Sequence, residues 1–504
     1  MKFEAAKLGS RELLAQGIIL AISAIVVAVW VFTKPIIFTH DSFTYIDQAR
    51  ELTLGTSATA MFSRLPAFPM ILWAFGVTDL KHSVFWLIIF QSCLAVASCW
   101  LFYLTARLIW PRGAFVAALV FIASLLPFLH VKYIMTEQTF FVETMLALYG
   151  IVAYLMARTN PEALQSIAIL GAGAALMSLT RPQAAYVIPL LFGMVAVFAW
   201  RRAWVALIGA VVAVCAVWSV QAVDQRVRSE SKTSVGSFDN SHQTGKMLLF
   251  AFYMQGLGEN IRIRPENGPK SAELRSLLID ELSKPDTLAR RMGYLANVAP
   301  QEVPAYVDRG FAVFDSNFFA MITYSALNER LGLKETDRLF FQVSLEAAAA
   351  HPLETAWLFL GKGLRIYLDP WMPAVPVYIE YGPFPAGTFQ PPLAEEITAA
   401  GDYSNATSTD LAIDRNVRWL MRGAVLLAII TLPIALRYPT WRITIALLVF
   451  GLYLNLAVVV GNSALFRYAI YAIPMNLLCA YAGVAAVTSA LHGRYARNSV
   501  IAHN

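Results

Sequence analysis

One short segment of the chain carries residues suited to acid–base chemistry. His40-Asp41-Ser42 opens the stretch HDSFTYIDQARELTLG, residues 40–55, which follows a long apolar run. A carboxylate such as that of Asp41 can accept the proton of an attacking hydroxyl group, which is the task of a general base. Asp and Ser are also favoured helix caps, so capping by Asp41 or Ser42 is an alternative interpretation. The two roles are compatible, because a helix N-terminus stabilises an ionised carboxylate.

Three arginines lie near the ends of apolar segments. A guanidinium binds phosphate through paired hydrogen bonds and stabilises charge that develops on a leaving group. Arg64 lies in SRLPAFPMILWAFG, where Pro66 and Pro69 interrupt a regular helix and indicate a kinked, re-entrant approach to the membrane. Arg181 lies in LTRPQAAY and Arg467 lies in FRYAIYAIPM. Anchoring to lipid headgroups is an equally good explanation for Arg64.

A third group of ionisable residues lies in KYIMTEQTFFVETML, residues 132–146. Lys132 precedes a predicted helix, and Glu137 stands in its first turn, where an anion is favourable in any helix. Glu143 lies deeper in the same helix, where that explanation fails. Burying an ionisable group at such depth is costly, which makes it a functional candidate. The supporting candidates are His40, Tyr45, Lys132, Glu137 and Tyr468.

Long apolar runs separate these groups. Of the 504 residues, 58% are hydrophobic and 14% are charged, against about 45–50% and about 25% in soluble domains. The runs have the length of a membrane-crossing helix, about 17–25 residues, and they lack the alternation of barrel strands. The predicted fold class is therefore an all-α polytopic membrane protein. Its ten predicted spans are residues 17–37, 83–109, 113–130, 138–157, 163–180, 183–200, 203–223, 417–436, 443–460 and 465–489.

Basic residues in the short connections predict the orientation, because cytoplasmic loops are enriched in Lys and Arg. If the N-terminus is cytoplasmic, every short loop on that side is basic. Both termini are then cytoplasmic, in an inner (plasma) membrane, and the candidate active site faces the periplasm or the exterior. The first run lacks a small-residue cleavage site, so we expect an uncleaved helix. The cytoplasmic arginines are Arg107, Arg112, Arg158, Arg201, Arg202, Arg437, Arg442, Arg494 and Arg497.

The same pattern predicts three domains. Residues 1–223 form a transmembrane module of about seven helices whose first outer loop, 38–82, carries Asp41. Residues 224–416 form a large non-cytoplasmic domain, helical and irregular, and residues 417–504 form the C-terminal helices and a cytoplasmic tail. The four cysteines fall in apolar runs and are interpreted as small hydrophobic residues. No His, Cys, Asp and Glu residues have convincing metal-ligand spacing, so no metal site is assigned.

The order of these motifs resembles the GT-C superfamily of integral-membrane glycosyltransferases. The resemblance consists of an acid after the first span, then Arg-x-Pro-x-x-Pro, Thr-Glu and Thr-Arg-Pro, which contain Asp41, Arg64, Glu137 and Arg181. It is similar to bacterial relatives of protein mannosyltransferases and of lipid A aminoarabinose transferases. HPLETAWLFLGKGLRIYL resembles the juxtamembrane helix of the family, and FRYAIYAIPM resembles its Arg-Tyr-x-x-x-x-x-Pro signature.

The resemblance implies transfer of a sugar from a polyprenyl-phosphate donor to an acceptor hydroxyl, with inversion at the anomeric carbon. It implies Asp41 as the catalytic base and Arg64, Arg181 and Arg467 as donor-phosphate ligands. The acceptor is a glycolipid, a polysaccharide or a protein, and the other partners are membrane lipids, with no nucleic acid. No cofactor is assigned. The family often has a second acid where this chain has Ser42, so a divalent cation stays open.

Two alternatives remain at this point. A surface-polysaccharide polymerase or ligase also has a large outer loop, but it uses diphosphate-linked lipids. A lipid or solute transporter is expected to show repeat symmetry and charged residues near the bilayer midplane. In this chain the charged candidates gather near one membrane boundary, which favours the glycosyltransferase.

Overall fold

The computed structural model comprises two compact units. The first contains Met1–Val235, Met372–Leu454 and Phe466–Asn504, and the second contains Gly236–Trp371 and Asn455–Leu465. The structure describes residues 9–53, 64–181, 184, 186–230, 245–246, 248–249, 252, 263–287, 290, 295, 297–312, 318, 327–368, 381–385, 387–393, 395–396, 407–438, 441–461 and 470–501.

Seven helices of the described residues are long and apolar enough to cross a membrane. A helix of about 20 residues spans about 30 Å, the thickness of the hydrocarbon core. The prediction of a helical, polytopic architecture is therefore confirmed. These helices are α1 (Ser10–Thr33), α4 (Phe85–Ile109), α6 (Glu137–Met156), α7 (Asn160–Thr180), α9 (Ala203–Glu230), α19 (Ser408–Ala435) and α22 (Ile473–Ile501).

The other three predicted spans coincide with shorter apolar helices, α5 (Ala114–Ala123), α8 (Val187–Phe198) and α20 (Trp441–Gly461). The helix predicted over 113–130 ends early. Leu125 adopts a left-handed conformation with a φ of 61°, and a 3-10 turn, η1 (Leu126–Phe128), follows. A left-handed residue ends an α-helix, so α5 covers only about half of the hydrocarbon core at about 1.5 Å per residue.

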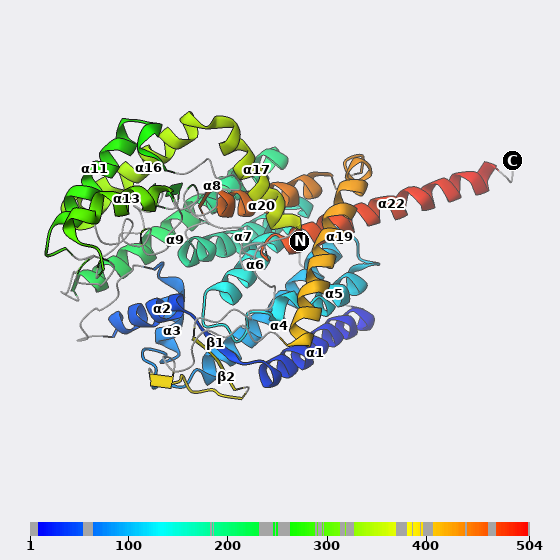
Figure 1. Ribbon diagram of the computed structural model, residues 1–504. Helices are drawn as coiled ribbons and strands as arrows, with labels where there is room; N and C mark the ends of the chain where they lie inside the picture. Colours follow the sequence, from blue (N-terminus) through cyan, green and yellow to red (C-terminus); the bar gives the residue numbers. More distant parts are fainter. Residues whose placement is uncertain are drawn as a thin grey trace. The chain divides into compact units, whose positions relative to one another are not determined.

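Helix α6 is the central helix of the first unit. In its most apolar stretch of 18 residues, 72% of the residues are buried, whereas the corresponding share in α1 is 28%. Small residues bring α7 close: a Cβ atom on Gly150 would lie 2.6 Å from the backbone nitrogen of Leu170, and one on Gly173 would lie 2.6 Å from that of Ala147. Figure 1 shows α6 and α7 side by side. The start of α6 and the end of α7 are therefore fixed next to each other.

A small sheet joins the segment after α1 to the segment before α6. Strand β1 (Ile36–Phe38) pairs antiparallel with β2 (Tyr381–Phe384), as Figure 1 shows. Across its other edge, the Ile37 N–H donates to the Lys132 carbonyl at 3.0 Å, and the Ile134 N–H donates to the Ile37 carbonyl at 3.1 Å. Two short helices follow β1: α2 (His40–Glu51) and α3 (Ala67–Ala74). The sheet thus places α2 beside the start of α6.

The second unit has its own apolar core, formed by residues such as Leu278, Val307 and Phe340. Arg275 donates to both carboxylate oxygens of Asp308, at 2.6 and 2.8 Å, and so joins two of its helices. Its described elements are η5 (Pro265–Asn267), α11 (Pro269–Ser283), η6 (Pro300–Glu302), α13 (Val303–Ala312), α15 (Asn328–Leu331), α16 (Leu333–Ala350) and α17 (Pro352–Leu368).

Candidate active site

Helix α2 is capped by Thr39. The Thr39 side chain accepts from the Ser42 N–H at 3.4 Å, and the Ser42 hydroxyl accepts from the Thr39 N–H at 2.9 Å. This reciprocal arrangement is a capping box. Capping by Asp41 is therefore wrong, and Ser42 only completes the box. Asp41 stands in the first turn of α2 with its carboxylate engaged elsewhere.

The Asp41 carboxylate forms an ion pair with Arg64. The Arg64 Nε also donates to the Thr44 hydroxyl at 2.9 Å, and the guanidinium lies 4.9 Å from the centre of the Tyr45 ring. The Gln48 amide holds the Arg64 backbone: it donates to the carbonyl at 2.7 Å and accepts from the N–H at 2.6 Å. The side chains of Arg64 and Asp41 are 26% and 30% exposed. A dissolved or lipid-borne molecule can therefore reach this pair.

A second ion pair joins the start of α6 to the end of α7. Arg181 Nη2 lies 2.5 Å from Glu137 Oε1, and the two side chains are only 6% and 0% exposed. The Arg181 Nε donates to the Thr136 hydroxyl at 2.8 Å. The guanidinium lies 5.6 Å from the Phe140 ring and 5.2 Å from the Tyr471 ring. A buried charge needs this degree of compensation, because desolvation of an unpaired ion costs several kcal/mol.

Tyr45 lies within electrostatic range of both ion pairs. Burial raises the pKa of its phenol, and the charges of Arg64, Asp41, Arg181 and Glu137 act on it as well. The Thr39 hydroxyl also contacts Met135 Sδ at 3.3 Å, which ties α2 to the residue before Thr136. The structure therefore brings together five of the residues selected from the sequence. We call them the Tyr45 cluster: Asp41, Tyr45, Arg64, Glu137 and Arg181.

Lys132, another sequence candidate, contacts the end of α1. Its ammonium donates to the carbonyls of Val31 at 2.9 Å and Lys34 at 2.6 Å, which are unpaired backbone groups at the C-terminus of that helix. Burial lowers the Lys132 pKa to about 8. Lys34 in turn forms an ion pair with Asp410 in the first turn of α19. These contacts join helix ends, so they give Lys132 a structural task.

The remaining candidates lie outside the described residues. They are Arg467, Tyr468 and the side chain of His40. Tyr471, from the same FRYAIYAIPM segment, is described, and it packs edge-to-face on Phe140 with ring centres 4.6 Å apart. Tyr471 is not among the residues predicted from the sequence, although an aromatic residue in a motif rich in Arg and Tyr could have suggested a cation–π contact.

Glu143 lies deeper in α6 and is buried. The Thr180 hydroxyl donates to its Oε1 atom at 2.7 Å, and among the described residues its Oε2 atom has no hydrogen-bond partner. Thr180 is the last residue of α7 and directly precedes Arg181. Glu143 therefore fixes the helix end from which Arg181 extends. Among the described residues, no group of three or more His, Cys, Asp and Glu side chains could hold a metal ion.

No protein-family model and no curated protein sequence matches the chain. Among solved structures it is similar to the archaeal oligosaccharyltransferase AglB from Archaeoglobus fulgidus, in complex with an inhibitory peptide and a dolichol-phosphate. That likeness has a TM-score of 0.42 and 13% identity, and covers 96% of this chain and 52% of that chain. The chain thus spans about half the length of AglB.

It is also similar to ArnT from Cupriavidus metallidurans. The apo structure gives a TM-score of 0.34 and 12% identity, covering 93% of this chain and 76% of that chain. The structure bound to undecaprenyl phosphate gives a TM-score of 0.34 and 12% identity, covering 93% of this chain and 77% of that chain. AglB and ArnT are both GT-C glycosyltransferases. At these identities and TM-scores the likeness assigns no activity to this chain.

Proposed function

We propose that the chain is a GT-C glycosyltransferase that moves a sugar from a polyprenyl-phosphate donor to an acceptor hydroxyl. The observation that carries the proposal is the Tyr45 cluster. It combines a carboxylate accessible to solvent, an arginine bound to it, and a second arginine buried within range of the same phenol. Base and phosphate ligand are the two functions that this reaction needs from a protein.

In the proposed reaction, a single displacement takes place at the anomeric carbon. The acceptor oxygen forms a bond to the anomeric carbon while the bond from that carbon to the phosphate oxygen breaks. The hydroxyl proton passes to the Asp41 carboxylate, and the electron pair leaves with the polyprenyl phosphate. Arg64 and Arg181 stabilise the charge that develops there. The resemblance implies inversion, which one displacement of this kind produces.

In this proposal, Arg64 exchanges Asp41 for the donor phosphate, and Asp41 exchanges Arg64 for the acceptor hydroxyl. Arg64 holds the carboxylate that acts as the base. An arriving donor phosphate is a competing anion for the same guanidinium, and its binding would release Asp41 toward the acceptor. Because Gln48 fixes the Arg64 backbone at both its N–H and its carbonyl, only the side chain needs to turn. Donor binding thereby exposes the base at the moment when the sugar is present.

The position of the cluster favours a lipid-borne phosphate. Glu137 is the first residue of α6 and Arg181 directly follows the last residue of α7, and both helices are of membrane length. A phosphate bound there lies at a membrane boundary, where the headgroup of a polyprenyl phosphate resides. A transporter is disfavoured, because its charged residues are expected near the midplane rather than at helix ends.

We further propose that this boundary faces the periplasm or the exterior and that both termini are cytoplasmic, in the inner (plasma) membrane. The basic short loops support this orientation. Cysteines introduced as Asn240→Cys and Asn498→Cys test it in intact cells with a membrane-impermeant thiol reagent. We expect labelling at 240 and protection at 498. Labelling at 498 would refute the orientation but would leave the proposed transfer reaction untested by that result.

The decisive experiment is Asp41→Asn, with Asp47→Asn as the matched control. Both acids lie on α2, and Asp47 also pairs with an arginine, Arg50, at 3.5 Å. Loss of a general base lowers turnover by about 10²–10⁴-fold. We expect that loss for Asp41→Asn, with donor binding retained, and turnover near wild type for Asp47→Asn.

The assay uses purified full-length protein, a panel of radiolabelled polyprenyl-monophosphate sugars, and a cell-envelope extract as acceptor. Release of polyprenyl phosphate and transfer of label are measured together. Loss of a general base should leave about a hundredth of the activity or less. If Asp41→Asn keeps more than about a tenth of the activity, Asp41 is not the base. Activity with a polyprenyl-diphosphate donor alone would identify a polymerase or ligase instead.

A further inference from the structure

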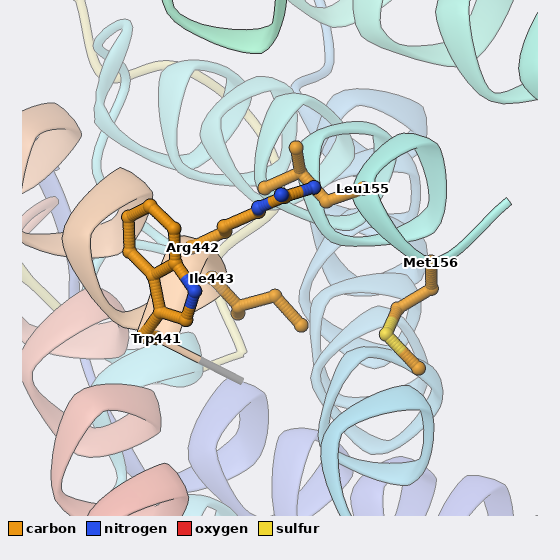
Figure 2. A pocket seen from close by; sticks show the side chains of 5 residues that line it. All are labelled: Leu155, Met156, Trp441, Arg442 and Ile443. Atoms are coloured by element: carbon orange, nitrogen blue, oxygen red, sulfur yellow. The ribbon is translucent and has the colours of Figure 1, made fainter. Parts of the chain in front are cut away.

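A cavity lies at the opposite end of α6 from the Tyr45 cluster. It has a volume of about 300 Å³ and is lined by Leu155, Met156, Trp441, Arg442 and Ile443; we call it the Arg442 cavity. Figure 2 shows the side chains of α20 on one side and those of α6 on the other, with the Arg442 guanidinium extending toward Leu155. The walls are thus apolar except for one cation. Since α6 has 20 residues, the cavity lies about 30 Å from the cluster at about 1.5 Å per residue.

More positive charge surrounds this cavity. Arg202 donates to the carbonyls of Ala157 and Arg158, the two residues that follow Met156. Phe198 packs edge-to-face on Trp441 with ring centres 5.9 Å apart, which brings the end of α8 and the adjoining arginines, Arg201 and Arg202, to the cavity. In the described part of the chain, no carboxylate forms an ion pair with Arg158, Arg201, Arg202 or Arg442.

One acid in this region, Glu162, is engaged in helix capping and also interacts electrostatically with Arg158. Glu162, in the first turn of α7, accepts from the backbone N–H groups of Arg158 and Thr159, the latter at 3.2 Å. Its carboxylate therefore caps a helix and is engaged there.

Exposed tryptophans mark the same helix ends. Trp200, Trp204 and Trp441 are exposed, and the apolar residues that follow along α9, such as Leu207, are exposed too. Tryptophan gathers where a membrane meets water, because its ring is apolar and its N–H is polar. This end of the first unit therefore lies at the depth of lipid headgroups.

We propose that the Arg442 cavity binds the phosphate headgroup of an anionic phospholipid. Arg442 would bind the phosphate, Trp441 would pack against the glycerol, and the acyl chains would follow the exposed apolar side chains. Basic pockets between transmembrane helices are suited to anionic headgroups. A volume of about 300 Å³ lies at the lower end of the range of about 300–1,000 Å³ for pockets that bind small molecules. The site is independent of the proposed transferase reaction.

The lining distinguishes a lipid from a free anion. Ile443 is buried, and Leu155 and Met156 add further apolar surface. Inorganic phosphate gains nothing from such walls, whereas the carbon atoms of a phospholipid do. A lipid held here would join α6 to α20 from the membrane side.

Binding is tested with the purified full-length chain in a zwitterionic detergent. Phosphatidylglycerol or phosphatidylcholine is titrated in, and bound lipid is counted by native mass spectrometry. We expect a preference for phosphatidylglycerol. Arg442→Gln should weaken that binding about fivefold, the fold-change for about 1 kcal/mol per basic residue near an anionic surface.

The matched control is Arg11→Gln. Arg11 is an exposed arginine in the first turn of α1 and does not line the cavity. It lies at the same end of the bundle, because the segment after α1 pairs with the segment before α6. Arg11→Gln should leave binding unchanged. Arg442→Lys, which keeps the charge, should bind more tightly than Arg442→Gln.

A second variant tests the cavity without removing charge. Met156 is exposed, so Met156→Trp can fill the space while the fold is retained, and it should abolish the phosphatidylglycerol preference. Three results would overturn the proposal: equal loss in Arg11→Gln and Arg442→Gln, full binding in Met156→Trp, or complete displacement of the lipid by millimolar inorganic phosphate.

Discussion

The two ends of α6 use arginine in opposite ways. At the start of the helix, Arg181 is 6% exposed and pairs with Glu137 at 2.5 Å. At its end, Arg158 and Arg442 are exposed, and no carboxylate of the described residues pairs with them. A buried pair carries a large desolvation cost that its contacts must offset, whereas an exposed cation costs little. The same residue type is thus a fixed part of a polar cluster at one end and an adaptable surface charge at the other.

Arg64 lies between these extremes. It is 26% exposed and pairs with Asp41, which is 30% exposed. An exposed pair is weak and can be exchanged for another anion, while a buried pair stays assembled. We therefore expect the Arg64 side chain to move during the proposed reaction and the Arg181 side chain to stay in place.

Among these arginines, the largest effect, on stability and turnover together, is expected from Arg181→Ala. Glu137 would then be a buried carboxylate without its partner, which costs about 3–5 kcal/mol of stability. Loss of a charge-assisted bond to the phosphate, about 1.5–3 kcal/mol, should lower turnover per folded molecule by roughly 10- to 150-fold. Thermal unfolding and the transfer assay measure the two effects separately.

A double variant separates structure from chemistry at this site. Arg181→Met with Glu137→Gln removes both charges, so most of the lost stability should return while turnover stays low. If turnover returns together with stability, Arg181 has only a structural role, and the contrast between the two ends of α6 concerns folding alone.

The sequence predicted the ionised members of the Tyr45 cluster for a physical reason. Charges beside long apolar runs are costly unless they are paired, so Asp41, Arg64, Glu137 and Arg181 stood out. The helices themselves followed from the length of those runs. Charged residues that are costly to bury can therefore be identified from a single sequence.

Neutral contributors were not predictable in this way. Gln48, Thr136 and Tyr471 act through contacts between segments far apart in the chain, and their residue types occur in many environments. Thr39 was missed as the α2 cap, because Thr, Ser and Asp have similar capping preferences. The early end of α5 depends on the backbone of Leu125, which hydropathy does not report.

Lys132→Met gives an intermediate effect and tests whether burial alone makes a cation part of the site. The variant leaves the carbonyls of Val31 and Lys34 without their donor, which costs about 1–3 kcal/mol per unsatisfied buried group. Turnover per folded molecule should stay near wild type. A loss of turnover like that of Arg181→Ala would add Lys132 to the catalytic machinery.

The effect of Lys132→Met on stability should depend on pH. Burial lowers the Lys132 pKa from 10.5 to about 8 in the folded state. Between these values the unfolded chain binds more protons, so the stability that Lys132 contributes rises with pH. The difference in unfolding midpoint between wild type and Lys132→Met should therefore widen from pH 8 to pH 10. A constant difference across this range would contradict the lowered pKa.

The smallest effect is expected from Arg201→Ala, the same substitution as Arg181→Ala made at the other end of the bundle. Arg201 is exposed, and its guanidinium lies 5.6 Å from the ring of the neighbouring Trp200. Exposed substitutions away from special features change stability by about 0.5 kcal/mol or less, and Arg201 lies far from Asp41. We therefore expect an unfolding midpoint and a turnover close to wild type, measured beside Arg181→Ala in one preparation series. If Arg201→Ala loses as much turnover as Arg181→Ala, charge at either end of α6 supports the reaction, and burial with pairing is not what selects the functional arginine.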